Sequence, residues 1–271
     1  MASVAERMLL VKPGEELVRS AVTAGFDLWV VLEPREPVPE AVRIERVFVA
    51  GPAMAADGAL HGLLTGLVRR YGIGQVLCGP GADDGARGVV RRIRQERSGA
   101  LWRDPAEERL KDPIGLRRLL RGSTQAPVRA EEAGTVRQAR AAAERLGPPV
   151  VIKSSGPQGG WRRTDFVRDA EGLAVWAKTA VDGTHLVEEL LAGPRFRVQT
   201  LSLGGMHHVV SVVVREGFAG RARTGPNAIS EIRSCVRELL DLAGFVSGAL
   251  RTDVVLTREG PRIAGCSDGG L

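Results

Sequence analysis

Short apolar runs alternate with segments of helical periodicity through the first hundred residues, and this alternation is the strongest constraint on the fold. The runs at residues 8–11, 28–32, 47–50 and 76–78 are strand-length and rich in β-branched residues. Between them, leucine recurs at helical spacing, as at Leu60, Leu64 and Leu67. Strands that alternate with helices predict a parallel sheet covered by helices. We therefore expect an N-terminal α/β domain over residues 1–104.

The composition excludes several classes of protein. No apolar run approaches the roughly 18 residues of a membrane span, and the first residues lack the pattern of a secretion signal, so we expect a cytoplasmic protein. The three cysteines are widely spaced and form no metal-binding motif. The net charge of +6 is dispersed, with no aromatic residues interleaved for base stacking, so no nucleic-acid partner is expected. The turn after the first strand contains one glycine, Gly14, where a dinucleotide site needs three, so we do not expect a nicotinamide or flavin site in this domain.

A different pattern follows residue 105. Helical periodicity predicts helices over 111–121, 136–146 and 170–180, and a buried strand over 150–153. From residue 184 the apolar period becomes two, which predicts an antiparallel hairpin of strands 195–203 and 206–215 around Gly204-Gly205. A further amphipathic helix ends at Ala243 and is followed by two more strands. His207 and His208 lie on one of these strands and point to opposite faces, so they do not form one metal site.

The segment with chemical content is a strand that ends in a lysine and is followed by a glycine-rich loop. Val150-Val151-Ile152-Lys153 precedes Gly156, Gly159 and Gly160. Such a lysine can place its ammonium against a polyphosphate while loop amides close over it. The alternative is a β-hairpin with a flexible tip and a lysine that extends to solvent.

The order of segments around this lysine resembles the ATP-grasp superfamily. It comprises the helix carrying Lys111, the helix that leads into Val150-Val151-Ile152-Lys153, the glycine loop, and Glu188-Glu189-Leu190-Leu191-Ala192-Gly193. The resemblance covers roughly residues 75–271. It implies an ATP-grasp fold of mixed α/β and α+β class, with an N-terminal parallel-sheet domain (1–104), a first lobe with a glycine-rich lid (105–183) and a second lobe (184–271).

The resemblance also implies a nucleotide site. Lys153 and Lys111 would contact ATP, and Gly156, Gly159 and Gly160 would belong to the lid over the phosphates. Residues 188–191, which are Glu188, Glu189, Leu190 and Leu191, would form the hinge that reads the adenine rim. The alternative for Glu188 and Glu189 is a pair of solvated charges at a strand end.

The family holds magnesium ions with an acidic residue on one strand and a Glu-x-Asn pair on the next. Asp253 stands at the first position, but the next strand reads Ile263-Ala264-Gly265-Cys266-Ser267-Asp268 and contains no such pair. Magnesium requires hard oxygen ligands. Three hypotheses remain: Asp253 and Asp268 share one remodelled metal site, the fold survives as a nucleotide or substrate binder, or another chain supplies what is missing.

The implied function is an ATP-dependent ligase of small-molecule biosynthesis, with ATP and Mg²⁺ as cofactors. It would convert a carboxylate to an acyl phosphate that an amine then attacks. Arg195 and Arg251 are candidates to hold the substrate. The alternative is a degenerate ATP-grasp protein that binds nucleotide or serves as a partner subunit. A homodimer or a protein partner is compatible with either reading.

Overall fold

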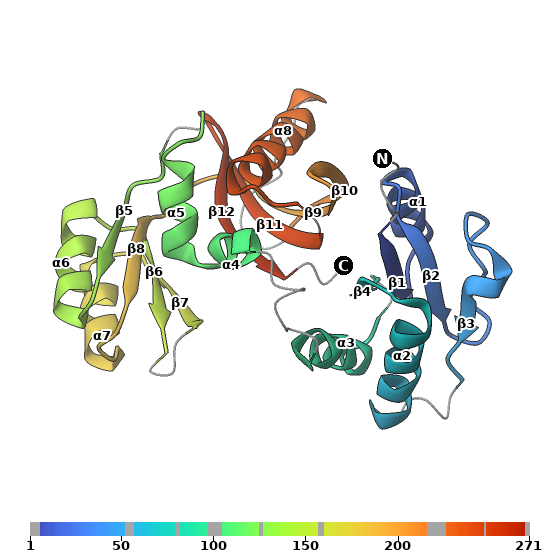
Figure 1. Ribbon diagram of the computed structural model, residues 1–271. Helices are drawn as coiled ribbons and strands as arrows, with labels where there is room; N and C mark the ends of the chain where they lie inside the picture. Colours follow the sequence, from blue (N-terminus) through green and yellow to red (C-terminus); the bar gives the residue numbers. More distant parts are fainter. Residues whose placement is uncertain are drawn as a thin grey trace.

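The computed structural model describes residues 6–51, 57–79, 82–96, 105–124, 127–156, 160–215, 226–246 and 248–268. Its strands form three four-stranded sheets, and Figure 1 shows one body built on each sheet. We call them the N-terminal domain, the middle lobe and the C-terminal lobe. The C-terminal lobe lies between the other two (Figure 1).

The N-terminal domain is the expected parallel sheet with helices on both faces. Its strands are β1 (Arg7–Val11), β2 (Asp27–Leu32), β3 (Val47–Val49) and β4 (Gln75–Cys78), in the order β3-β2-β1-β4. The helix α1 (Glu15–Thr23) packs on one face, while α2 (Asp57–Tyr71) and α3 (Asp84–Glu96) pack on the other. Because both faces are covered, successive residues such as Leu9 and Leu10 are both fully buried, which explains the continuous apolar runs. A short 3-10 helix, η1 (Ile44–Arg46), precedes β3.

The middle lobe is an antiparallel sheet with two helices on one face. Its elements are β5 (Ala130–Ala133), α6 (Val136–Leu146), β6 (Val150–Ser155), β7 (Trp161–Val167), α7 (Ala170–Thr179) and β8 (His185–Glu189), with sheet order β5-β8-β6-β7. Thr135 and Asp169 cap α6 and α7 by accepting hydrogen bonds from backbone amides. Since β8 lies between β5 and β6, the sheet places this strand in the middle lobe rather than in a lobe that begins at residue 184.

The C-terminal lobe is a second antiparallel sheet, ordered β10-β9-β11-β12. Its elements are β9 (Arg195–Leu203), β10 (Met206–Val214), α8 (Pro226–Ala243), β11 (Gly248–Thr257) and β12 (Gly260–Asp268), and α8 covers one face. The helix predicted over 111–121 is confirmed as α5 (Pro113–Leu120), and a helix that was not predicted, α4 (Pro105–Lys111), precedes it with a break at Asp112. The break occurs because Asp112 caps α5 and Pro113 begins it. Both helices pack into the core under α8, so this stretch belongs with the C-terminal lobe.

The N-terminal domain and the C-terminal lobe share a hydrophobic core. Leu201 of β9, Val210 of β10 and Ala249 of β11 are buried in the cluster that α1 forms with β1 and β2. No helix in the described part of the chain is both long and apolar enough to cross a membrane.

Candidate functional site

A buried cluster of three charged side chains joins the middle lobe to the C-terminal lobe. On β6, Val150 and Ile152 face the helices of the middle lobe, so Lys153 points to the opposite face. Glu188 lies on the neighbouring strand β8, and Arg117 comes from α5. We call these three residues the ion cluster.

Every charged group of the ion cluster has a direct partner. The ammonium of Lys153 lies 2.8 Å from Glu188 Oε2 and donates a hydrogen bond of 2.9 Å to the carbonyl of Ala264 on β12. Arg117 donates from Nε to Glu188 Oε1, and from Nη1 to the carbonyl of Ile263 at 2.7 Å. These bonds hold α5, β6, β8 and β12 at one point.

The ion cluster carries an excess of positive charge in a buried place. Glu188 is 4% exposed and Arg117 is 7% exposed. Burial raises the pKa of Glu188, but the charges of Arg117 and Lys153 outweigh it and hold that pKa below its ordinary value. Burial lowers the pKa of Lys153, and the positive charge of Arg117 lowers it further against the opposing effect of Glu188. Two cations therefore share one carboxylate, and an anion bound next to Lys153 would relieve the imbalance.

The hinge (residues 188–191) begins within β8, whose last two residues are Glu188 and Glu189. Glu189 accepts a hydrogen bond of 2.9 Å from the Arg129 amide through its Oε1 and donates its own amide to the Arg129 carbonyl. The Leu190 amide donates to the carbonyl of Pro149 at 3.1 Å, whereas no bond joins the Leu191 amide to any residue that the structure describes. The buried position of Glu188 excludes the solvated strand-end alternative for this residue.

The glycine-rich loop connects β6 to β7. The Gly156 amide donates to the carbonyl of Gly160 at 2.9 Å, and Gly160 has a positive φ of 80° that favours glycine. Gly159 lies outside the described residues. Directly after the loop, Trp161 Nε1 donates a hydrogen bond of 2.8 Å to Asp112, so the start of β7 is tied to the beginning of α5.

Lys111 is not part of the ion cluster. It is the last residue of α4, and its ammonium pairs with Glu107 one turn earlier on the same helix. None of the described contacts joins it to Lys153, so a nucleotide-contacting role for Lys111 stays a prediction.

The face of the C-terminal sheet opposite α8 is lined by arginines. Phe196 and Val198 pack under α8, so Arg195 and Arg197 of β9 point to the other face. Asp253 of β11 is paired directly with Arg197 in the register of the two strands. Its carboxylate lies 3.9 Å from Arg197 Nε and 3.9 Å from Arg215 Nη1. Arg251, two residues earlier on β11, donates from Nε to Ser267 Oγ at 2.8 Å.

The residues at Asp253 do not fit a magnesium site. The β12 residue that pairs with Asp253 is Gly265, which offers no side-chain oxygen. Asp268 pairs with Leu250, which lies three positions before Asp253 on β11, so the strand register does not bring Asp268 next to Asp253. The side chain of Asp268 is not among those that the structure describes. No group of three or more potential metal ligands exists among the described residues, and the charged neighbours of Asp253 are arginines. The remodelled two-aspartate site is therefore not supported.

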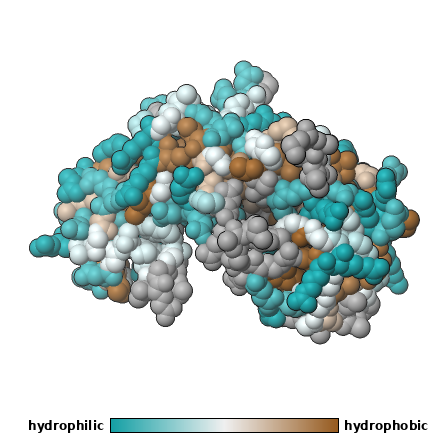
Figure 2. All heavy atoms as spheres, in the orientation of Figure 1, coloured by the Kyte–Doolittle hydropathy of each residue, from teal (hydrophilic) through white to brown (hydrophobic). Residues whose placement is uncertain are grey.

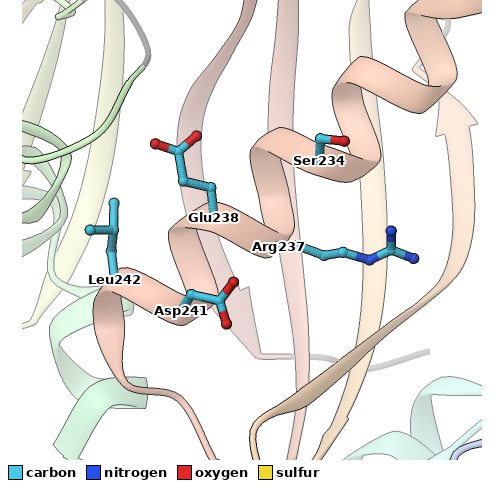
Figure 3. A pocket seen from close by; sticks show the side chains of 5 residues that line it. All are labelled: Ser234, Arg237, Glu238, Asp241 and Leu242. Atoms are coloured by element: carbon cyan, nitrogen blue, oxygen red, sulfur yellow. The ribbon is translucent and has the colours of Figure 1, made fainter.

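In the space-filling view a notch separates the lower part of the middle lobe from the rest of the molecule (Figure 2). A pocket of about 110 Å³ lies between α5 and the strands β5 and β8, with Arg117 and Leu186 in its wall. A second, wide and open depression lies on α8 and is lined by Ser234, Arg237, Glu238, Asp241 and Leu242 (Figure 3). Its carboxylates have structural partners, because Glu238 accepts hydrogen bonds from Ser123 and Thr124, and Asp241 lies 3.3 Å from His207 Nε2.

Sequence reasoning did not single out Arg117 or Arg215. Arg117 lies three residues after Ile114 and three before Leu120, on the apolar stripe of α5. An arginine on such a stripe is the signal that a buried carboxylate partner exists elsewhere in the chain. No comparable local signal marks Arg215.

No family model matches the chain, and no curated protein matches it. Solved structures do. Biotin carboxylase from Campylobacter jejuni, described as a complex with β-γ-ATP, has a TM-score of 0.58 and 12% identity, with 99% of this chain and 66% of that chain covered. L-amino acid ligase from Bacillus licheniformis has a TM-score of 0.51 and 17% identity, with 98% and 67% covered. Phosphoribosylglycinamide synthetase from Anaerococcus prevotii has a TM-score of 0.52 and 13% identity, with 98% and 68% covered. The chain thus spans about two thirds of the length of these proteins and has their fold.

Proposed function

Because the chain has the ATP-grasp fold, we propose that it binds ATP between its middle and C-terminal lobes and uses it to join a carboxylate to an amine. The observation that carries the proposal is the ion cluster, a buried set of two cations and one carboxylate next to the hinge and the glycine-rich loop. The buried excess of positive charge favours an anionic ligand at this point.

Three groups around the ion cluster suit the parts of ATP. The Lys153 ammonium has three N–H groups, and its described bonds to Glu188 and Ala264 use two, which leaves one for a phosphate oxygen. At the hinge, the Leu191 amide and the carbonyl of Glu189 offer a donor and an acceptor for the adenine edge. The loop glycines 156, 159 and 160 would supply backbone amides to the phosphates.

The proposed reaction has two steps. A carboxylate oxygen attacks the γ-phosphorus of ATP, the bond from that phosphorus to the β-γ bridging oxygen breaks, and ADP leaves. The amine nitrogen then attacks the acyl carbon, loses a proton, and inorganic phosphate leaves with the C–O bond electrons. The protein contributes positioning and neutralisation of phosphoryl charge through Lys153. Arg195 and Arg251 are the proposed contacts for the carboxylate substrate. We infer that the substrates are small molecules, since the structurally similar L-amino acid ligase is named for a small-molecule substrate.

A second candidate function is nucleotide binding without turnover. Gly265 stands opposite Asp253 where a second carboxylate would complete a metal site, and this observation favours a binding protein. The two candidates share the nucleotide site and differ only in whether ADP is released when a carboxylate is present.

Calorimetry with ATP tests the nucleotide site. We expect wild type to bind ATP and the Lys153→Met variant to bind it about tenfold or more weakly, since a hydrogen bond to a charged group contributes about 1.5–3 kcal/mol. Lys178→Met is the matched control, because Lys178 is an exposed lysine on α7 of the same lobe. Absence of ATP binding by wild type contradicts both candidates.

An acyl phosphate assay separates the two candidates. Hydroxylamine attacks an acyl phosphate to give a hydroxamate, so we expect hydroxamate and ADP to form together when wild type meets its carboxylate within a panel of amino acids. ATP binding without ADP release across the panel favours the binding protein. Circular dichroism of each variant verifies that it is folded.

A further inference from the structure

The arginine-lined face of the C-terminal sheet is turned toward the middle lobe. The guanidinium carbon of Arg195 lies 5.8 Å from the ring centroid of Phe166 on β7, the strand that follows the glycine-rich loop. Phe166 pairs with Val151, which lies two residues before Lys153 and on the same face of β6. The arginines on β9 and the lysine on β6 therefore lie on the facing surfaces of the two lobes.

Asp253 sits between two guanidinium groups without a hydrogen bond to either. Both distances are 3.9 Å, which is beyond hydrogen-bonding range. Arg197 Nε and Asp253 Oδ1 are buried atoms with no hydrogen-bond partner among the described residues. A buried polar atom without a partner is costly, so an oxygen ligand that displaced the Asp253 carboxylate and accepted a hydrogen bond from Arg197 Nε would remove that cost.

Positive charge is in excess at this face. Arg195, Arg197 and Arg215 surround the single carboxylate of Asp253. Guanidinium groups of like charge repel one another, and both burial and the charge of Arg215 lower the pKa of Arg195. An oxyanion relieves this repulsion, and arginine binds phosphate oxygens with paired hydrogen bonds.

We propose that Arg197 and Arg215, with Arg195 beside them, form a phosphate-binding site that neutralises phosphate charge without a divalent cation. Guanidinium groups occupy the surroundings of Asp253, where a metal ion would need further oxygen ligands. That this phosphate belongs to a nucleotide rests on the proposed function. The arginine site itself is formed by the C-terminal lobe and can be tested with a ligand that contains no nucleoside.

Pyrophosphate provides that test, because it has phosphate charge and no adenine. Calorimetry on the full chain in EDTA measures its affinity for wild type, Arg197→Gln and Arg215→Gln. We expect wild type to bind pyrophosphate and each variant to bind it about tenfold or more weakly, since a charge-assisted hydrogen bond is removed. Arg258→Gln is the control, because Arg258 is exposed in the turn between β11 and β12. The Arg215 variant keeps the test decisive should the Arg197 variant fail to fold.

The variant Asp253→Asn should change the affinity for pyrophosphate in a way that tells phosphate binding by the arginines from metal binding by Asp253. If the arginines bind phosphate, removal of the competing carboxylate tightens pyrophosphate binding in EDTA by about tenfold. If Asp253 is a metal ligand, wild type binds pyrophosphate only when Mg²⁺ is present, and the same change weakens the binding measured with Mg²⁺. Weaker binding in Asp253→Asn, a requirement for Mg²⁺, or equal affinity in Arg197→Gln, Arg215→Gln and Arg258→Gln overturns the inference.

Adenosine separates this inference from the proposed function. It carries no phosphate, so its binding in EDTA reports the hinge alone. If adenosine binds and the arginine variants bind pyrophosphate as tightly as wild type does, only the arginine site is contradicted. Pyrophosphate binding that depends on Arg197 without any binding of adenosine or ATP contradicts only the nucleotide site.

Discussion

Replacing Glu188 by glutamine leaves two buried cations without the carboxylate that joins them. Glu188 is 4% exposed, accepts a hydrogen bond from Arg117 and lies 2.8 Å from the ammonium of Lys153. Glutamine keeps the size of the side chain and removes its charge. Loss of one member of a buried ion pair costs about 3–5 kcal/mol. At a slope of about 2–3 kcal/mol per molar urea, the unfolding midpoint falls by about 1–2 M.

Urea titration of tryptophan fluorescence measures this change, since Trp161 and Trp176 report on the middle lobe. The control is Glu132→Gln. Glu132 lies on β5, the strand next to β8, and pairs with Arg118, the immediate neighbour of Arg117, but this pair is exposed to solvent. Exposed ion pairs contribute little, so the midpoint of the control should equal that of wild type. Equal midpoints for Glu188→Gln and Glu132→Gln refute the reasoning that the buried cluster holds the lobes together.

The pKa of Glu188 lies below its ordinary value of 4.5, because Arg117 and Lys153 outweigh the opposing effect of burial. Below pH 4.5 the side chain of Glu188 therefore binds protons more readily in the unfolded state, and wild type should lose folding free energy as the pH falls. Urea titrations at pH 3–6 should show a smaller loss for Glu188→Gln, which lacks this titrating group. Desolvation raises the pKa of Cys235 and Cys266 to about 12, so both thiols should react slowly with a disulfide reagent at pH 8 and rapidly in urea. Fast reaction of these thiols in the native protein contradicts their raised pKa. Gly193→Ala should sharply lower the melting temperature, because the new Cβ would lie 2.1 Å from the Leu256 carbonyl, whereas Gly88→Ala on α3 meets no atom within 4 Å and should preserve or raise it.

Most of the helices and strands were predictable because their signals are local. The parallel sheet of the N-terminal domain, the helix α6 and the hairpin of β9 and β10 all follow from the period of apolar residues, and the structure confirms them. The helix α4 was missed, and its last residue, Lys111, was assigned to the start of the next helix. Aspartate followed by proline, as in Asp112-Pro113, is the pattern of a helix start and would have placed the beginning of α5 two residues later.

The candidate site was predictable only in part, because its completing members are distant in sequence. Lys153 and Glu188 were identified from the segments that carry them, but Arg117 is 71 residues from Glu188 and joins it only through the packing of α5. The relation of Asp253 to β12 depends on a register that shifts between Asp253 and Val254. Such a β-bulge changes which residues face each other and leaves no reliable mark in the sequence.

The core that the N-terminal domain shares with β9, β10 and β11 limits how this protein can be divided. A fragment that ends before α4 would expose the apolar face that Leu201, Val210 and Ala249 cover in the whole chain. The complementary fragment would expose those three side chains themselves. The N-terminal domain is consequently not an interchangeable module, and an exchange with another protein succeeds only if the matching surface of the C-terminal sheet is transferred with it.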